Sequence, residues 1–107
     1  IAIQKTRFRG YELHYENKTA TNSMIRAGDE FPSFFEPRDS EPLIIDCGAN
    51  IGVSVLEWKT RWPMSRIICF EPDPDAFRLL TLNMERNDIN FYENLESEIK
   101  RVILLDS

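Results

Sequence analysis

A strand runs directly into a glycine-containing turn and then into a helix, within residues 43–62. The strand sequence LIIDC is apolar until Asp46. The turn after it consists, in order, of Gly48, Ala49, Asn50, Ile51 and Gly52. Glycine lets the backbone bend sharply and lets a ligand approach it without a Cβ in the way. A carboxylate and two glycines at this junction therefore predict a ligand site, and the alternative is a tight turn that binds nothing.

The second half of the chain alternates strand-like and helix-like segments. Residues 65–72, SRIICFEP, read as a second buried strand, and residues 101–107, RVILLDS, read as the last one. Continuous apolar runs suit parallel strands buried on both faces. Alternation of strands and helices predicts an α/β fold with a Rossmann-like, mostly parallel sheet and right-handed crossovers. INFY (89–92) is a further short strand and residues 94–100 a short helix in this interpretation.

Each buried strand of the expected sheet ends on or just before a carboxylate. Ligands bind beyond the carboxyl ends of the strands in open α/β sheets. If all strands run in one direction, the carboxylates come to the same edge. The candidate site residues at that edge are Asp46, Glu71 and Asp106.

Two helices are expected between these strands. Residues Ile51, Val55, Trp58 and Trp62 recur at helical spacing and predict one inward stripe, which Pro63 ends. Asp73 is a good N-cap ahead of a proline in the first helical turn. The inward face of that second helix is predicted to consist of Phe77, Leu80 and Met84, with a left-handed cap at Asn87.

Residues 1–42 differ from the rest of the chain in their pattern of apolar and polar residues. They are interpreted as an N-terminal extension to a partial domain at 43–107. IAIQKTRF and YELHY flank Arg9-Gly10 and predict a two-stranded hairpin. A short helix is expected over 19–26, with Thr19, Thr21 or Asn22 as its cap. A proline-rich loop follows, and its aromatic residues are expected to form a lid on the core. They are Phe31, Phe34 and Phe35.

The composition excludes several classes of protein. The 107 residues are 42% hydrophobic with a net charge of −5, which indicates one soluble globular domain and argues against nucleic acid or an anionic membrane as the main partner. No apolar run reaches the roughly 20 residues of a membrane span, and the first residues do not resemble a signal peptide, so we expect a cytoplasmic protein. Cys47 and Cys69 are expected to be buried strand residues, His14 a surface residue, and no metal site is predicted.

The turn favours one ligand chemistry over another. A pyrophosphate is bound by bare backbone amides in a GxGxxG turn, whereas this turn has GxxxG spacing with Asp46 two positions ahead. A positive or hydrogen-donating ligand therefore fits better, and a nucleotide-dependent oxidoreductase is disfavoured. Glu71, at the end of the next strand, is placed to accept both hydroxyls of a ribose. The alternative is a carboxylate that stabilises a helix N-terminus, a role that Asp73 fills better.

Together these segments resemble the FkbM-type family of S-adenosylmethionine-dependent methyltransferases. The family pattern is D-x-G-A-N-x-G, then F-E-P-x-P, then F-x-x-L-x-x-N-x-x-x-N. Over about residues 43–91 the matching residues are Asp46, Gly48, Ala49, Asn50, Gly52, Phe70, Glu71, Pro72, Pro74, Phe77, Leu80, Asn83 and Asn87. In the family the fourth strand typically ends D-x-E-G, whereas here Asp106-Ser107 end the chain, so the resemblance covers the N-terminal part of the domain.

The resemblance implies a class I methyltransferase fold with S-adenosyl-L-methionine as cofactor. The glycine motif then holds the methionine part, Glu71 the ribose, and Asp73 lies near the adenine, with Pro72 and Asp106 also at the cofactor. The implied reaction is methylation of a hydroxyl oxygen on a small molecule or carbohydrate, and no catalytic residue is assigned. The alternative is a non-catalytic module of the same fold that serves as an interaction domain.

Overall fold

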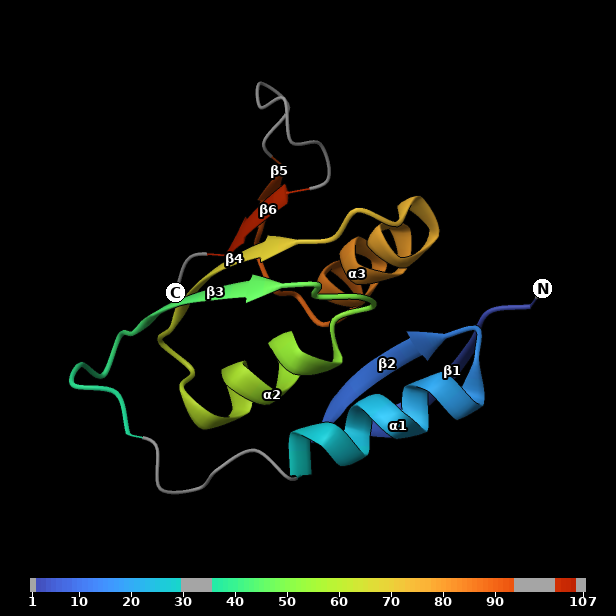
Figure 1. Cartoon of the computed structure of the whole chain (residues 1–107), viewed down its shortest axis with the longest axis horizontal. Coiled ribbons are helices and arrows are strands. Elements are labelled where there is room, and N and C mark those ends of the chain that lie inside the picture. The colour runs from blue at the N-terminus through green and yellow to red at the C-terminus, as the bar shows by residue number, and fades with distance from the viewer. Residues whose placement is uncertain (1, 30–35, 94–101, 106–107) are drawn as a thin grey trace.

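The computed structural model describes residues 2–29, 36–93 and 102–105. The expected aromatic lid, the helix at 94–100 and Asp106 lie outside the described residues. The elements, in chain order, are β1 (Gln4–Phe8), β2 (Tyr11–Tyr15), α1 (Lys18–Asp29), β3 (Leu43–Cys47), α2 (Val53–Arg61), β4 (Arg66–Phe70), α3 (Pro74–Arg86), β5 (Tyr92–Glu93) and β6 (Val102–Leu105) (Figure 1). Among the described residues, no helix is long and apolar enough to cross a membrane.

The main sheet has the strand order β3-β4-β6-β5. β3 and β4 are parallel and are joined through α2, whereas β6 runs antiparallel to both β4 and β5. The expectation of a mostly parallel sheet therefore holds for β3 and β4 and is wrong for β6, and the α/β class is correct. A parallel crossover needs about a dozen residues or more, and β5 and β6 are separated only by residues 94–101.

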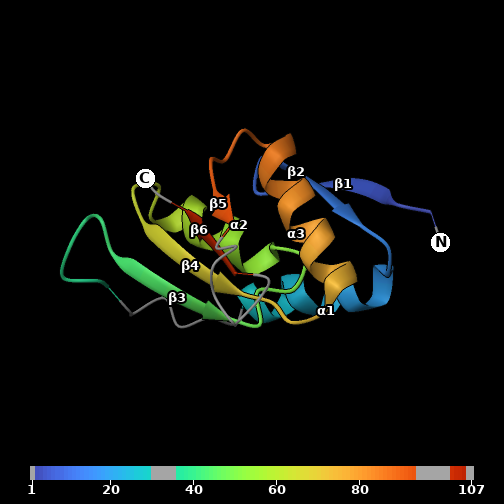
Figure 2. The ribbon, with the colours of Figure 1, turned by 90° about the horizontal axis from the view of Figure 1, so that it is seen from above.

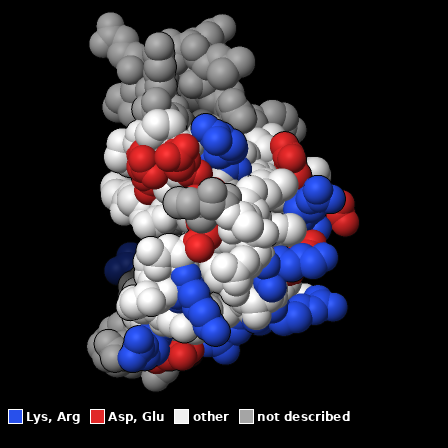
Figure 3. Space-filling view, turned by 90° about the vertical axis from the view of Figure 1, so that its right-hand side faces the viewer, with Lys and Arg blue, Asp and Glu red and all other residues white. Residues whose placement is uncertain are grey.

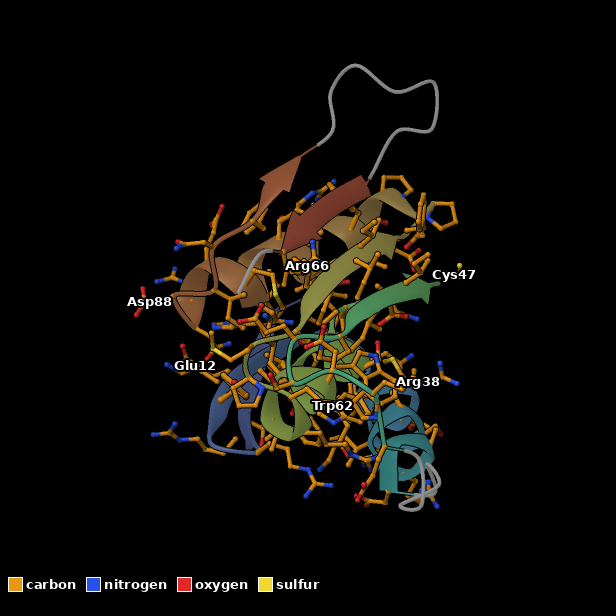
Figure 4. All side chains as sticks on the ribbon, turned by 90° about the vertical axis from the view of Figure 1, so that its left-hand side faces the viewer. Glu12, Arg38, Cys47, Trp62, Arg66 and Asp88 are labelled. Carbon is orange, nitrogen blue, oxygen red and sulfur yellow. The ribbon has the colours of Figure 1, made fainter. Side chains whose placement is uncertain are left out.

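Strand β3 lies at an edge of the described sheet and not at its centre. Leu43 is 54% exposed and Ile45 is 60% exposed, while Ile44 on the opposite face is partly buried against the core. Cys47 at the end of the strand is exposed as well (Figure 4). The prediction that this strand is buried on both faces is thus wrong, because the described helices cover one face only. Cys69 on β4 is fully buried, as predicted.

Helix α2 begins after Gly52 and ends at Arg61, before Pro63, as expected. Its inward face differs from the predicted stripe. Val55 and Leu56 are fully buried, whereas Trp58 is only partly buried and stacks on Trp62 with ring centroids 5.8 Å apart.

Helix α3 begins as its sequence predicts. Asp73 is the N-cap, and its Oδ2 accepts a hydrogen bond from the Ala76 N–H at 2.9 Å. Leu80 and Met84 are fully buried, as expected of its inward face. The left-handed residue after the helix is Asp88, with φ 55°, and not Asn87, whose side chain has another function.

The N-terminal hairpin also forms as predicted. Arg9 and Gly10 both have positive φ, 51° and 82°, which is the combination that a tight two-residue hairpin turn requires. Helix α1 starts one residue earlier than expected, and its cap is Asn17, whose Oδ1 accepts from the Ala20 N–H at 2.9 Å. The His14 side chain is only 13% exposed and its Nε2 lies 3.3 Å from Glu12, so it is not the surface residue that was predicted.

The hairpin is fixed to the rest of the molecule by two asparagines of α3. Asn83 bonds the backbone N–H and C=O of His14, at 2.7 and 3.1 Å. Asn87 does the same for Glu12, at 2.8 and 2.7 Å. Both strand residues direct these groups away from β1, so the asparagine amides take the place of a neighbouring strand. Figure 2 shows the hairpin and α3 side by side.

Candidate functional site

The glycine turn is tied to the carboxyl end of the neighbouring strand. The N–H groups of Gly48 and Ala49 both donate to the Phe70 carbonyl oxygen, at 2.8 and 3.1 Å. The next N–H, of Asn50, donates to Glu71 Oε1 at 2.8 Å. Three successive amides are therefore already used within the protein, and they do not form the open ring of donors that a phosphate needs.

Glu71 is buried, with 7% of its surface exposed, and it joins two loops. While Oε1 accepts from Asn50, Oε2 accepts from the Asp73 N–H at 2.9 Å. Each carboxylate oxygen can accept more than one hydrogen bond. Ribose binding by Glu71 stays a prediction, and the structure gives this carboxylate a second task that the sequence did not reveal.

Asp46 points toward the first turns of α2. The Ser54 hydroxyl donates to its Oδ2 at 2.5 Å, and the Trp58 side chain also donates a hydrogen bond to this carboxylate. Burial nevertheless raises the pKa of the Asp46 carboxyl above its ordinary value, and the nearby Glu71 carboxylate adds to this rise. Sequence reasoning missed Ser54, whose only signal is its place at the start of the helix after the glycine turn.

A cavity of about 290 Å³ lies between α1, α2 and the glycine turn. We call it the helix cavity. The turn contributes Gly48, Ala49 and Asn50 to its wall, and α1 covers it with Met24 and Ala27. From α2 come Val53, Ser54, Glu57 and Trp58. Its lining is largely apolar, with the Ser54 hydroxyl and the Glu57 carboxylate as its polar side chains on α2.

A second cavity, of about 190 Å³, lies between the first turns of α1 and α3. We call it the acidic cavity because three carboxylates line it, those of Glu16, Asp73 and Asp75. Asn50 and Met24 line both cavities, so the two are neighbours on either side of these residues. On the face seen in Figure 3, acidic side chains gather in a patch at the upper left, while lysine and arginine side chains lie mainly at the right and below.

Glu57 is a further polar residue that sequence reasoning missed. Its carboxylate is buried, at 2% exposure, and lines the helix cavity. Arg9 of the hairpin turn lies 3.0 Å from it and Arg61 lies 3.2 Å from it, so its charge is compensated. A lone Glu among the apolar residues of a helix was the available signal, because buried carboxylates need such partners.

The structure also bears on the reactivity of Cys69 and on metal binding. Burial raises the pKa of the Cys69 thiol, so this thiol stays protonated and unreactive. Within the described ranges, no group of three or more His, Cys, Asp or Glu side chains is placed to hold a metal ion.

The structure brings most of the predicted site residues to the ends of β3 and β4. Asp46, Gly48, Ala49, Asn50, Glu71 and Asp73 are linked there by the contacts above, and Pro72 is exposed between the last two. Gly52, the last residue of the glycine turn, lies against α3. Its φ is 103°, and a Cβ at this position would lie 3.0 Å from Leu80 and 3.2 Å from Met84, so it allows α3 to approach.

Strand β6 does not end at this edge. Leu105 pairs with Ile67, near the amino end of β4, because the two strands are antiparallel. Of the three strand ends that were predicted to share one edge of the sheet, those of β3 and β4 therefore lie there, and that of β6 does not. Asp106 follows Leu105 and lies outside the described residues.

Two curated proteins are similar to about half of the chain. Over 49 residues the chain is 43% identical to Methyltransferase sdnD of Sordaria araneosa, an alignment that covers 46% of this chain and 19% of that protein. Over 54 residues it is 37% identical to Methyltransferase 1 of Beauveria bassiana, covering 50% and 22%. No protein-family model and no solved structure matches the chain. The chain thus spans about a fifth of the length of these curated relatives, and half of it is similar to proteins named methyltransferases.

Proposed function

We propose that this chain is the cofactor-binding part of an S-adenosyl-L-methionine-dependent methyltransferase of the FkbM type, with a class I, Rossmann-like arrangement around β3 and β4. One observation carries the proposal. The glycine turn and the loop after β4 are locked together at Asn50 and Glu71, and Asn50 lies between two neighbouring cavities. The similarity to two methyltransferases supports it.

The residues present fit this cofactor better than a dinucleotide. The molecule carries a sulfonium cation, hydroxyl donors on its ribose and an exocyclic amine, and it has no phosphate. The acidic cavity offers carboxylate acceptors from Glu16, Asp73 and Asp75. The amides of the turn are already bonded inside the protein, so a pyrophosphate would find no free donors at Gly48, Ala49 or Asn50.

We place the adenosyl part at the acidic cavity and the methionine part toward the helix cavity. In this arrangement Asp46 and Glu71 act mainly by holding the loops and by keeping the region negative, and Asn50 lies at the junction. The cofactor supplies a methyl group that is already activated on sulfur. The chain's residues bind and orient it, since alignment with the acceptor oxygen supplies most of the catalytic effect.

The acceptor in this proposal is a hydroxyl of a small molecule or carbohydrate, and neither nucleic acid nor membrane is a partner. A general base is needed only where the acceptor must lose a proton. Residues 1–42 are proposed as an extension that covers the site, and 43–107 as the partial cofactor-binding domain, in the cytoplasm.

A second candidate function is a non-catalytic interaction module of the same fold. The exposed side chains of Leu43 and Ile45 on the open face of β3 favour it, because a partner seated there would remove their apolar surface from water. This candidate predicts a folded chain that transfers no methyl group to any acceptor tested, including within a longer protein that contains it.

Isothermal titration calorimetry with S-adenosylhomocysteine tests the proposed function. We expect saturable binding to the wild-type chain, weakened by substitution of Asn50 by Lys, which places a positive charge between the two cavities and opposes the sulfonium. The exposed Asp88→Asn variant is the control. Absence of heat from a chain that unfolds cooperatively contradicts the proposal, as does equal binding of NADH.

A further inference from the structure

We propose that Asn83 is a positioning residue that sets the geometry of the glycine turn and so the affinity for the cofactor. This inference rests on the proposed function and goes beyond it, because Asn83 touches neither cavity. It lies on α3, and its side chain is fully buried, at 0% exposure. It reaches the turn by a contact to the backbone carbonyl oxygen of Ile51.

The amide of Asn83 is fully used by three backbone groups. Its Oδ1 accepts from the His14 N–H at 2.7 Å. Its Nδ2 donates to the His14 carbonyl at 3.1 Å and to the Ile51 carbonyl at 2.8 Å. A primary amide has two N–H donors, and both are engaged here. One side chain therefore connects β2 of the hairpin with the turn at the end of β3.

Ile51 directly follows Asn50, the residue that lies between the two cavities. Asn50 has φ 51° and Gly52 has φ 103°, so Ile51 lies between two left-handed residues. Such a backbone persists only where its surroundings hold it. The holding contacts are the Glu71 carboxylate on Asn50, the Asn83 amide on Ile51, and Leu80 and Met84 of α3 against Gly52.

Asn87 is a matched control within the same helix. It bonds the Glu12 backbone through both ends of its amide, as Asn83 bonds His14. Its remaining N–H donates to the backbone carbonyl oxygen of Asn83 at 2.7 Å and not to the turn. Loss of either asparagine weakens the attachment of the hairpin, but only loss of Asn83 frees the Ile51 carbonyl.

The experiment compares Asn83→Asp and Asn83→Ala with Asn87→Asp and Asn87→Ala in the full chain. The aspartates keep the size and the acceptor and remove the donors. Three quantities are measured: the free energy of unfolding, the hydrogen-exchange rates of the Asn50 and Gly52 amides without ligand, and the affinity for S-adenosylhomocysteine. In the Asn83 variants we expect these two amides to exchange roughly tenfold faster. We also expect these variants to bind S-adenosylhomocysteine roughly tenfold more weakly, which is the scale of one lost hydrogen bond. The Asn87 variants, although destabilised, should stay within about twofold of the wild type in both.

The other outcomes contradict either the role proposed for Asn83 or the proposed function of the chain. Equal effects of the Asn83 and Asn87 variants on exchange and affinity assign both residues to hairpin attachment alone and end the proposal. The same holds if neither Asn83 variant folds while both Asn87 variants do, because Asn83 is then a requirement of the fold. If the wild-type chain does not bind S-adenosylhomocysteine, the proposed function fails, whereas the exchange rates still decide whether Asn83 positions the turn.

Discussion

Glu71 and Asn50 are joined across the ends of two parallel strands, by a 2.8 Å hydrogen bond from the Asn50 N–H to Glu71 Oε1. The second oxygen of the same carboxylate accepts from Asp73, the cap of α3. One buried side chain thus sets the distance between the glycine turn and the start of the next helix. A change in ligand affinity on substitution of Glu71 would therefore include the loss of this structural task.

Substitution of Glu71 by Ala is expected to reduce both stability and ligand affinity. Two backbone amides lose a charged acceptor, and hydrogen bonds to charged groups contribute about 1.5–3 kcal/mol each, so the free energy of unfolding should fall by about 3–6 kcal/mol. Urea denaturation measures this loss, and calorimetry measures affinity. Glu85→Ala serves as the control, because Glu85 is exposed on α3 and lines neither of the two cavities. Unchanged stability of Glu71→Ala would show that the two amides find other acceptors.

Substitution of Gly52 by Ala is expected to lower stability, and the same change at Gly28 should raise it. At Gly52 the φ is 103° and the new Cβ would lie 3.0 Å from Leu80, so strain and overpacking add, costing about 2 kcal/mol. At Gly28, inside α1, the nearest atom is 3.8 Å away, and Ala favours a helix by about 0.5–1 kcal/mol over Gly. Thermal denaturation of both variants gives the comparison. A shift of the same sign at both sites contradicts this account of Gly52.

The pH dependence of stability should carry a contribution from Asp46. Because its pKa is raised in the folded chain, the folded state binds this proton more tightly than the unfolded state. The contribution is therefore fully present below the unfolded pKa of about 3.9, and it is lost as the pH rises through the folded pKa. Asp46→Asn removes the titration. The difference in unfolding free energy, wild type minus variant, should fall as the pH rises over this window. A difference that rises with pH would reverse the assigned shift.

Neutralising Glu57 should be far more costly than neutralising Asp29, although both carboxylates contact Arg9. The Glu57 side chain is 3% exposed and pairs with Arg9 and Arg61, whereas that of Asp29 is 58% exposed. Glu57→Gln removes the buried negative charge that both guanidinium groups contact and is expected to cost about 2–3 kcal/mol. Asp29→Asn removes a surface pair and should cost less than about 1 kcal/mol. Guanidinium chloride denaturation in high salt measures both, and similar losses would argue that water reaches Glu57.

Local features of the fold were predictable from the sequence because their causes lie within a few residues. The hairpin follows from Arg9-Gly10 between two alternating segments, and both residues take positive φ. The start of α3 follows from Asp73 and Pro74. The position of α2 after Gly52 and before Pro63 follows in the same way. Exact caps were less predictable, since Asn17 and Asp88 compete with neighbours of similar propensity.

For the candidate site, the sequence identified the turn and the two acidic strand ends but not their partners. Asp46 and Glu71 lie at the carboxyl ends of two neighbouring parallel strands, and the Glu71 carboxylate adds to the rise of the Asp46 pKa. Ser54, Glu57 and the cover from Met24 were not foreseen, because each depends on how α1 and α2 pack.

The sequence by itself determined where the chain turns, where two of its helices begin and which residues of the strand ends carry charge. These depend on φ preferences, caps and polarity over short stretches. Only the tertiary structure decided that β6 runs antiparallel, that one face of β3 is open, and that Asn83 bonds a strand 69 positions away. Such pairings depend on which distant groups compete for the same partner. The propensities of short segments contain no information about that competition.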